Sequence, residues 1–181
     1  MARGRERGFT LIELMIAIAM FSSLLLIAMP RFTDFQESMT MKATARNLAT
    51  NFRLAQQRAS AANRPCYMDF DLTESFLTIW LDTDLDETFD GLEEVRAVGF
   101  VQTDQNGSVP GVLLPANTIF ESTTFSAGTR GFPSVAFASD GSVAEAGEVV
   151  VRDDGGRRYR ISVTLPGAIV IAQDIGGSWV E

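Results

Sequence analysis

A run of acids between residues 82 and 93 has the spacing of a calcium-binding loop. Carboxylate oxygens in this pattern suit Ca²⁺, and a bound cation would relieve the repulsion between neighbouring acids. Position 6 of the loop is Glu87 rather than the glycine that favours a sharp turn, and the preceding residues have a strand pattern. The sequence therefore favours a solvated acidic turn without a cofactor, and calcium remains the alternative. The acids at loop positions 1, 3, 5, 9 and 12 are Asp82, Asp84, Asp86, Asp90 and Glu93.

Few residues are suited to catalysis. The 181 residues include no histidine, which excludes Ser-His-Asp and Cys-His mechanisms and histidine-ligated zinc. Cys66 is the only cysteine, and we expect it inside a strand. The pairs Asp69/Asp71 and Asp153/Asp154 are close in sequence, but closeness does not create the cleft that glycoside hydrolysis needs. We therefore expect no enzymatic activity.

A single acid, Glu13, interrupts the apolar stretch of residues 9–29, which follows three arginines in residues 1–8. About 22 residues of helix span ~33 Å, enough to cross a bilayer. Residues 9–30 are therefore expected to be transmembrane, with the N-terminus cytoplasmic and the later chain outside. A carboxylate in lipid costs on the order of a few kcal/mol unless it is paired. Glu13 is expected either to stay wet at the headgroups or to have a cationic partner in another subunit.

Residues 8–13, with the sequence GFTLIE, resemble the type IV prepilin leader motif. The resemblance implies that a prepilin peptidase cleaves after Gly8 and that the new N-terminus, Phe9, is methylated. It also implies that Glu13 pairs with the N-terminal amine of a neighbouring subunit during assembly. Pro30 corresponds to a proline that bends the helix in many pilins.

Two further segments follow the apolar stretch. Residues 31–62 are expected to continue as an amphipathic helix, because apolar residues recur mostly every three or four positions until Asn63 and Pro65 stop it. From residue 63 the period changes to two. We expect an α+β fold: a leader (1–8), a helix (9–62), and a periplasmic body (63–181) of about eight strands in two sheets, on which the helix packs. The expected strands are 66–71, 76–81, 95–101, 112–114, 118–120, 134–138, 148–152, 159–165 and 168–172.

The body also carries a family resemblance. Residues 47–70 resemble the passage from helix to first strand in the GspH/FimT family, and residues 137–171 resemble its C-terminal half. The resemblance implies a minor pseudopilin of a type II secretion system or a minor pilin of a type IV pilus. Such a subunit stays in the inner membrane by one span until it enters a periplasmic or cell-surface filament. There it contacts other minor and major pilins at or near the tip, and helps to initiate filament assembly and protein secretion.

A DNA-binding minor pilin for DNA uptake is the alternative. Some FimT-like proteins are implicated in uptake through a basic G-R-x-R-like motif, but the matching residues 167–170 are GAIV, without arginine. Arg157, Arg158 and Arg160 form a basic cluster one hairpin earlier, where a solvated hairpin is expected. Residues 65–181 carry six arginines against nineteen acids, a net charge of −13, which repels phosphate. We therefore expect no nucleic-acid partner.

Overall fold

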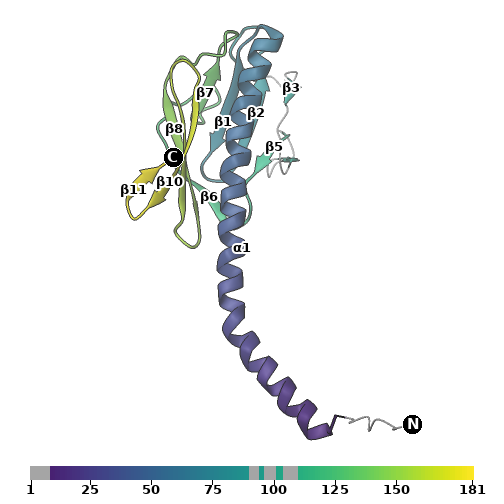
Figure 1. The fold of residues 1–181 in the computed structure, drawn as a ribbon. Coiled ribbons are helices and arrows are strands. Elements are labelled where there is room, and N and C mark those ends of the chain that lie inside the picture. Colours follow the sequence, from purple (N-terminus) through teal and green to yellow (C-terminus); the bar gives the residue numbers. More distant parts are fainter. Residues whose placement is uncertain (1–8, 90–93, 96–100, 104–109) are drawn as a thin grey trace, which may run out of the picture. The chain divides into compact units, whose positions relative to one another are not determined.

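The computed structural model describes residues 9–89, 94–95, 101–103 and 110–181, and the side chains of residues 26–31, 94–95, 101–103 and 110 lie outside this set. The chain forms two compact units, Met1–Met39 and Thr40–Glu181, which we describe separately. The described helix, α1, extends over Leu11–Ala62 (Figure 1). The helix continues through Pro30. The bend expected at that residue stays a prediction.

Local sequence signals account for the C-terminal end of α1. Asn63 has φ of 52°, and a residue in this left-handed conformation commonly ends a helix. The N–H of Arg64 donates to the carbonyl of Ala59 at 3.1 Å, which satisfies one of the last carbonyl groups. Pro65 follows and cannot extend the helix. The predicted helix end is therefore confirmed.

Sheet A contains six antiparallel strands of the body. Its order is β4 (Val101–Thr103), β5 (Pro110–Leu113), β2 (Phe76–Leu81), β1 (Cys66–Asp71) and β7 (Ser134–Phe137), and β3 (Glu94–Val95) also pairs with β2. The predicted hairpin of residues 66–71 and 76–81 is confirmed as β1 and β2, with Cys66 opposite Leu81. The predicted strand 95–101 includes residues 96–100, which lie outside the described residues.

Sheet B contains five antiparallel strands. Its order is β11 (Ser178–Val180), β10 (Ile169–Ile175), β9 (Arg158–Val163), β8 (Gly147–Asp153) and β6 (Thr118–Thr123). The described residues therefore form eleven strands, and the predicted body of two sheets is confirmed. Strand β11 was missed. The prediction for β6 ended at residue 120, three residues too early, because a register shift between Phe120 and Ser122 interrupts the period of two.

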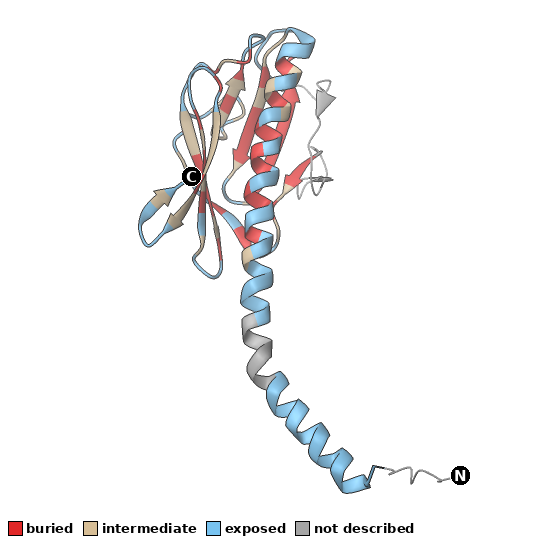
Figure 2. Cartoon of the chain, in the orientation of Figure 1, coloured by how far each residue is buried: buried red, intermediate tan, exposed pale blue. Residues whose placement is uncertain are grey.

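The core lies where the second half of α1 packs on the β body (Figure 2). Phe52 is fully buried, and its ring lies 5.8 Å from Phe70, 6.4 Å from Phe125 and 6.3 Å from Phe137, measured between centroids. Small side chains let the helix approach closely: the buried alanines of α1 are Ala45, Ala49, Ala55 and Ala59. On α1, Met39 is exposed and Met41 is buried, so the side of the helix that packs on the body includes Met41.

Candidate assembly site

The N-terminal segment begins with a capped helix. Gly8 lies outside the described residues, and Phe9 is 81% exposed. The hydroxyl oxygen of Thr10 accepts the backbone N–H of Glu13 at 3.3 Å, and the Thr10 carbonyl accepts that of Leu14 at 3.2 Å. Thr10 is thus the N-cap of α1. Sequence reasoning missed this role, although a Thr followed three residues later by Glu is a known helix-start signal.

Glu13 lies in the first turn of α1 and is exposed. A carboxylate in this position interacts favourably with the positive N-terminal end of the helix dipole. The capping bond uses only the backbone N–H of Glu13, so it leaves the carboxylate able to receive a cation. The geometry therefore permits pairing with an amine from another chain and does not itself test that pairing.

The segment from Phe9 to Leu25 exposes every large apolar side chain. Each is more than half exposed in the structure. Among the described residues, no helix combines the length and the apolarity that crossing a membrane requires. An apolar surface of this kind normally has an apolar partner. The exposed side chains are Phe9, Leu11, Ile12, Leu14, Met15, Ile16, Ile18, Met20, Phe21, Leu24 and Leu25.

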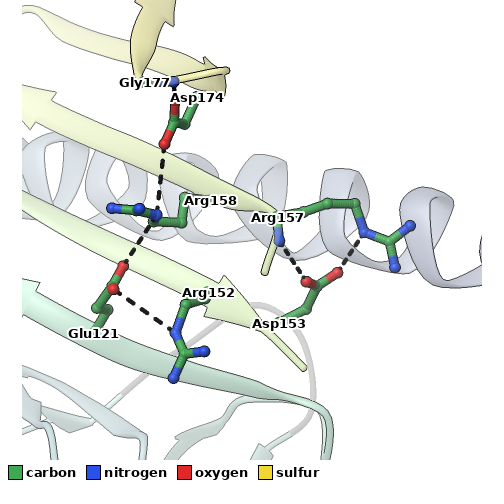
Figure 3. A network of polar contacts seen from close by, with 7 residues as sticks. All are labelled: Glu121, Arg152, Asp153, Arg157, Arg158, Asp174 and Gly177. Atoms are coloured by element: carbon green, nitrogen blue, oxygen red, sulfur yellow. Dashed lines mark hydrogen bonds and ion pairs between the residues drawn. The ribbon is translucent and has the colours of Figure 1, made fainter. Parts of the chain in front are cut away.

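The basic cluster near the β8–β9 turn is neutralised by carboxylates (Figure 3). Asp153 lies 2.6 Å from Arg157 Nε. Arg158 Nε lies between Glu121 at 3.8 Å and Asp174 at 3.5 Å, so β9 is linked to both β6 and β10. Each of these two arginines already has an anionic neighbour, which lowers its value as a phosphate ligand.

Arg160, the third arginine of the cluster, also has an anionic neighbour. Its guanidinium lies 3.4 Å from the carboxylate of Glu148 and 4.7 Å above the ring centroid of Trp179. Both contacts are with residues of sheet B, and they keep the guanidinium of Arg160 against the surface of that sheet. The predicted cluster is therefore a set of cross-strand contacts and not an open basic patch.

The acidic loop is partly organised by its own backbone. Asp82, Asp84 and Asp86 offer oxygen atoms within 4.8 Å of one another. Asp82 is fully buried and accepts the N–H groups of Leu85 at 2.6 Å and Glu87 at 3.2 Å. Hydrogen bonds from the hydroxyl and backbone N–H of Thr88 lower the pKa of Asp86.

Glu87 of this loop has φ of 59°, so a glutamate adopts a left-handed conformation that glycine reaches more readily. Asp90 and Glu93 lie outside the described residues. The structure thus brings together three of the five candidate calcium ligands, and calcium stays the untested alternative to a solvated turn.

The two candidate catalytic carboxylate pairs have structural partners. Asp69 is buried and accepts the indole N–H of Trp80 at 2.9 Å and a guanidinium N–H of Arg130 at 3.0 Å. Asp71 accepts two backbone N–H groups in the β1–β2 turn, at 2.8 Å and 3.0 Å. In the second pair, Asp153 is held by Arg157 as described above. These contacts give each of the three carboxylates a structural role.

Cys66 is fully buried at the start of β1, as the sequence predicted. Burial raises the pKa of its thiol to about 12. Because the thiolate is the reactive form of cysteine, this environment makes Cys66 inert at neutral pH.

Two family models match the chain. Residues 3–29 match the prokaryotic N-terminal methylation motif, and residues 44–167 match the type II transport protein GspH. The chain belongs to the GspH family of minor pseudopilins and type IV minor pilins. The predicted family and leader motif are thereby confirmed, and the family is one of structural subunits.

Solved structures of similar fold agree with this membership. The minor pseudopilin EpsH of the Vibrio cholerae type 2 secretion system is 14% identical, with a TM-score of 0.51 over 72% of this chain and 94% of that one. The type IV minor pilin FimU of Pseudomonas aeruginosa is 13% identical, with a TM-score of 0.50 over 81% of this chain and 97% of that one. GspH of E. coli is 14% identical, with a TM-score of 0.51 over 75% of this chain and 89% of that one. At these identities the likeness shows the fold, and the predicted α+β class is confirmed. No curated protein matches the sequence.

The body of this GspH-family chain is expected not to bind DNA. A soluble fragment of residues 32–181 should give no salt-sensitive shift of duplex DNA at roughly micromolar protein, because Arg157, Arg158 and Arg160 have anionic neighbours and the net charge of the fragment is negative. The double variant Ala168→Arg/Val170→Arg, which restores arginines to the matching motif, is the positive comparison. Binding by the unaltered fragment that weakens as salt rises would overturn the expectation.

Proposed function

We propose that this GspH-family chain is a minor subunit at or near the tip of a type II secretion pseudopilus or a type IV pilus, where it helps to initiate assembly. The observation that carries the proposal is the combination, in one chain, of an exposed apolar helix with a single acid, Glu13, and a compact β body. The similarity to structures of a minor pseudopilin and a type IV minor pilin supports the same class of filament.

The proposed cycle begins in the inner membrane. Residues 9–30 hold the subunit in the bilayer by one span, and the arginines of residues 1–8 keep the N-terminus on the cytoplasmic side. The β body then lies in the periplasm. Prepilin peptidase cleaves after Gly8, and methylation leaves a cationic amine on Phe9. Thr10, the helix cap, lies between this amine on Phe9 and the first residue of α1, Leu11.

Glu13 gives the assembly step its direction. In lipid, an unpaired carboxylate costs on the order of a few kcal/mol. In the filament, the N-terminal amine of a neighbouring subunit compensates that charge, while the exposed apolar side chains contact other apolar helices. The subunit therefore moves from a state with an uncompensated acid to one in which the acid is paired. The partners are the other minor and major pilin-like subunits, and the β body supplies contacts specific to this subunit.

Replacing Glu13 with alanine tests the pairing. We expect Glu13→Ala to insert into the membrane and be processed normally, but to enter filaments about tenfold less or worse, because pairing is worth on the order of a few kcal/mol. The measurement is the amount of subunit in sheared filaments relative to the membrane fraction. Glu37→Ala, which removes an exposed acid from the same helix, is the matched control. Equal incorporation of Glu13→Ala and Glu37→Ala would refute the pairing role.

A further inference from the structure

A groove of about 330 Å³ lies between α1 and strands β10 and β11 of sheet B. Lys42 and Arg46, one turn apart on α1, line one wall of it. The other wall is apolar and is formed by Ile171, Ile175 and Val180. We call this feature the cationic groove.

The apolar wall is a part of sheet B that α1 does not cover. Tyr159 on β9 is opposite Gln173 on β10, and Gln173 is opposite Val180 on β11, so these residues share one face of the sheet. On β9 this face is buried, with Tyr159 only 5% exposed. Towards the edge of the sheet it opens to solvent, because Ile175 is 59% exposed and Val180 is 50% exposed. The face that packs on α1 therefore extends beyond the helix and lacks part of its cover.

Contacts on the opposite face of sheet B hold the β10–β11 hairpin in place. Asp174 accepts the N–H of Gly177 at 2.7 Å and lies 3.5 Å from Nε of Arg158 on β9 (Figure 3). The guanidinium of Arg160 lies 4.7 Å from the ring centroid of Trp179 on β11. The apolar wall of the groove is therefore the exposed side of strands that are fixed to the sheet from behind.

The cations of the groove have no carboxylate partner in the part of the chain that the structure describes. Neither Lys42 nor Arg46 forms an ion pair there, although Glu181 lines the same groove. Residues 65–181 behave differently. Each of their described arginines has a carboxylate oxygen at 3.7 Å or closer, namely Arg130, Arg152, Arg157, Arg158 and Arg160. In a chain with an excess of acids, two adjacent cations without an internal partner favour an anionic partner from another molecule.

We propose that the cationic groove binds a segment of a different pilin-like subunit, and that this segment carries acidic and apolar side chains. Its apolar side chains cover Ile175 and Val180, and its carboxylates face Lys42 and Arg46. The apolar wall from Ile171 to Ile175 is ~13 Å long at 3.3 Å per residue, which suits two to three turns of helix or a short strand. The segment thus completes the layer that α1 begins.

The class of partner rests on the proposed function, because a subunit in such a filament meets other pilin-like subunits. The contact joins unlike chains, so it does not require copies of this chain to repeat along the filament. It is therefore compatible with a minor subunit at or near the tip. The charge of the groove, two cations against Glu181, favours an acidic segment over a neutral one.

Photochemical cross-linking of the full-length chain in filament-producing cells tests the groove. Ile175 is replaced by p-benzoylphenylalanine, the cells are irradiated, and the products are mapped by mass spectrometry. We expect an adduct with a different protein that carries a prepilin leader motif, at a peptide that contains Asp or Glu beside apolar residues. The same replacement at Leu165, which is 57% exposed but does not line the groove, should give about tenfold less of that adduct or none.

Charge variants distinguish the groove from a general apolar contact. Arg46→Asp should lower the yield of the adduct at residue 175 about tenfold or more, because it places like charges opposite one another. Arg53→Asp, at an exposed arginine of α1 that does not line the groove, should leave the yield unchanged. Arg46→Lys keeps the charge and should keep most of the yield. Replacement of the partner's cross-linked acid by lysine should restore the adduct with Arg46→Asp.

Three results would overturn the proposal: no adduct at residue 175, an adduct only with lipid or with another copy of this chain, or an adduct only with a protein outside the pilin-like class. Equal yields from Arg46→Asp and Arg53→Asp would also overturn it. If these results occurred while Glu13-dependent incorporation held, the role of the groove alone would be wrong. Failure of Glu13-dependent incorporation would count against the proposed function instead.

Discussion

Replacement of Gly167 by alanine is expected to destabilise the β body by about 3 kcal/mol or more. Gly167 lies in the β9–β10 turn with φ of 84°, where a side chain is strained. An added Cβ would also collide with the carbonyl oxygen of Gly141 and with Nε2 of Gln56. Nε2 of Gln56 donates to the carbonyls of Gly141 at 2.7 Å and Gly167 at 3.1 Å. The substitution therefore disrupts the link between α1 and two turns as well as straining the backbone.

Gly156→Ala is the matched control. Gly156 lies in the β8–β9 turn with φ of 78°, and a Cβ there would meet no atom within 4 Å. It should cost about 1 kcal/mol through the backbone alone. Urea denaturation of the fragment of residues 32–181 measures both variants. Equal losses of unfolding free energy would mean that the Gln56 link contributes nothing beyond backbone strain.

Truncation of Phe52 to alanine is expected to lower the unfolding free energy by about 3–5 kcal/mol, the usual cost of removing a buried phenylalanine. Phe52 is 0% exposed. Its ring contacts Phe70 on β1, Phe137 on β7 and Phe125 in the loop after β6. The cavity would open where α1, sheet A and this loop meet, and the surrounding alanines of α1 are too small to fill it.

Phe35→Ala provides the comparison for Phe52→Ala, because Phe35 lies on the same helix but is 57% exposed. Its effect on unfolding should stay within about 0.5 kcal/mol. Both are measured by urea denaturation in the same fragment. If Phe52→Ala unfolded at the same urea concentration as Phe35→Ala, the described core would be wrong at its centre.

Features of the fold that depend on nearby residues were predictable. The hairpin of β8 and β9 follows from alternating apolar residues around the sequence DDGG, and the stop of α1 follows from Asn63 and Pro65. In each case the signal lies within a few residues of the structure that it specifies. The same holds for the leader motif, which is contiguous in sequence.

Features that depend on distant residues were not predictable. Gln56 contacts carbonyls 85 and 111 positions away, and Asp69 is held by Arg130, 61 positions away. Strand β11 was missed because it has only three residues after Gly176 and Gly177. The basic cluster of β9 was recognised, but its carboxylate partners on other strands were not, since strand order decides which charges meet.

Intact-mass and peptide analysis of the mature N-terminus tests the central account most directly. In the proposed function, a membrane-stored subunit becomes competent for assembly when the leader is removed after Gly8. We therefore expect chains in filaments to begin with N-methylated Phe9, without residues 1–8. Filament chains that retain residues 1–8, or that begin at any residue other than Phe9, would contradict it.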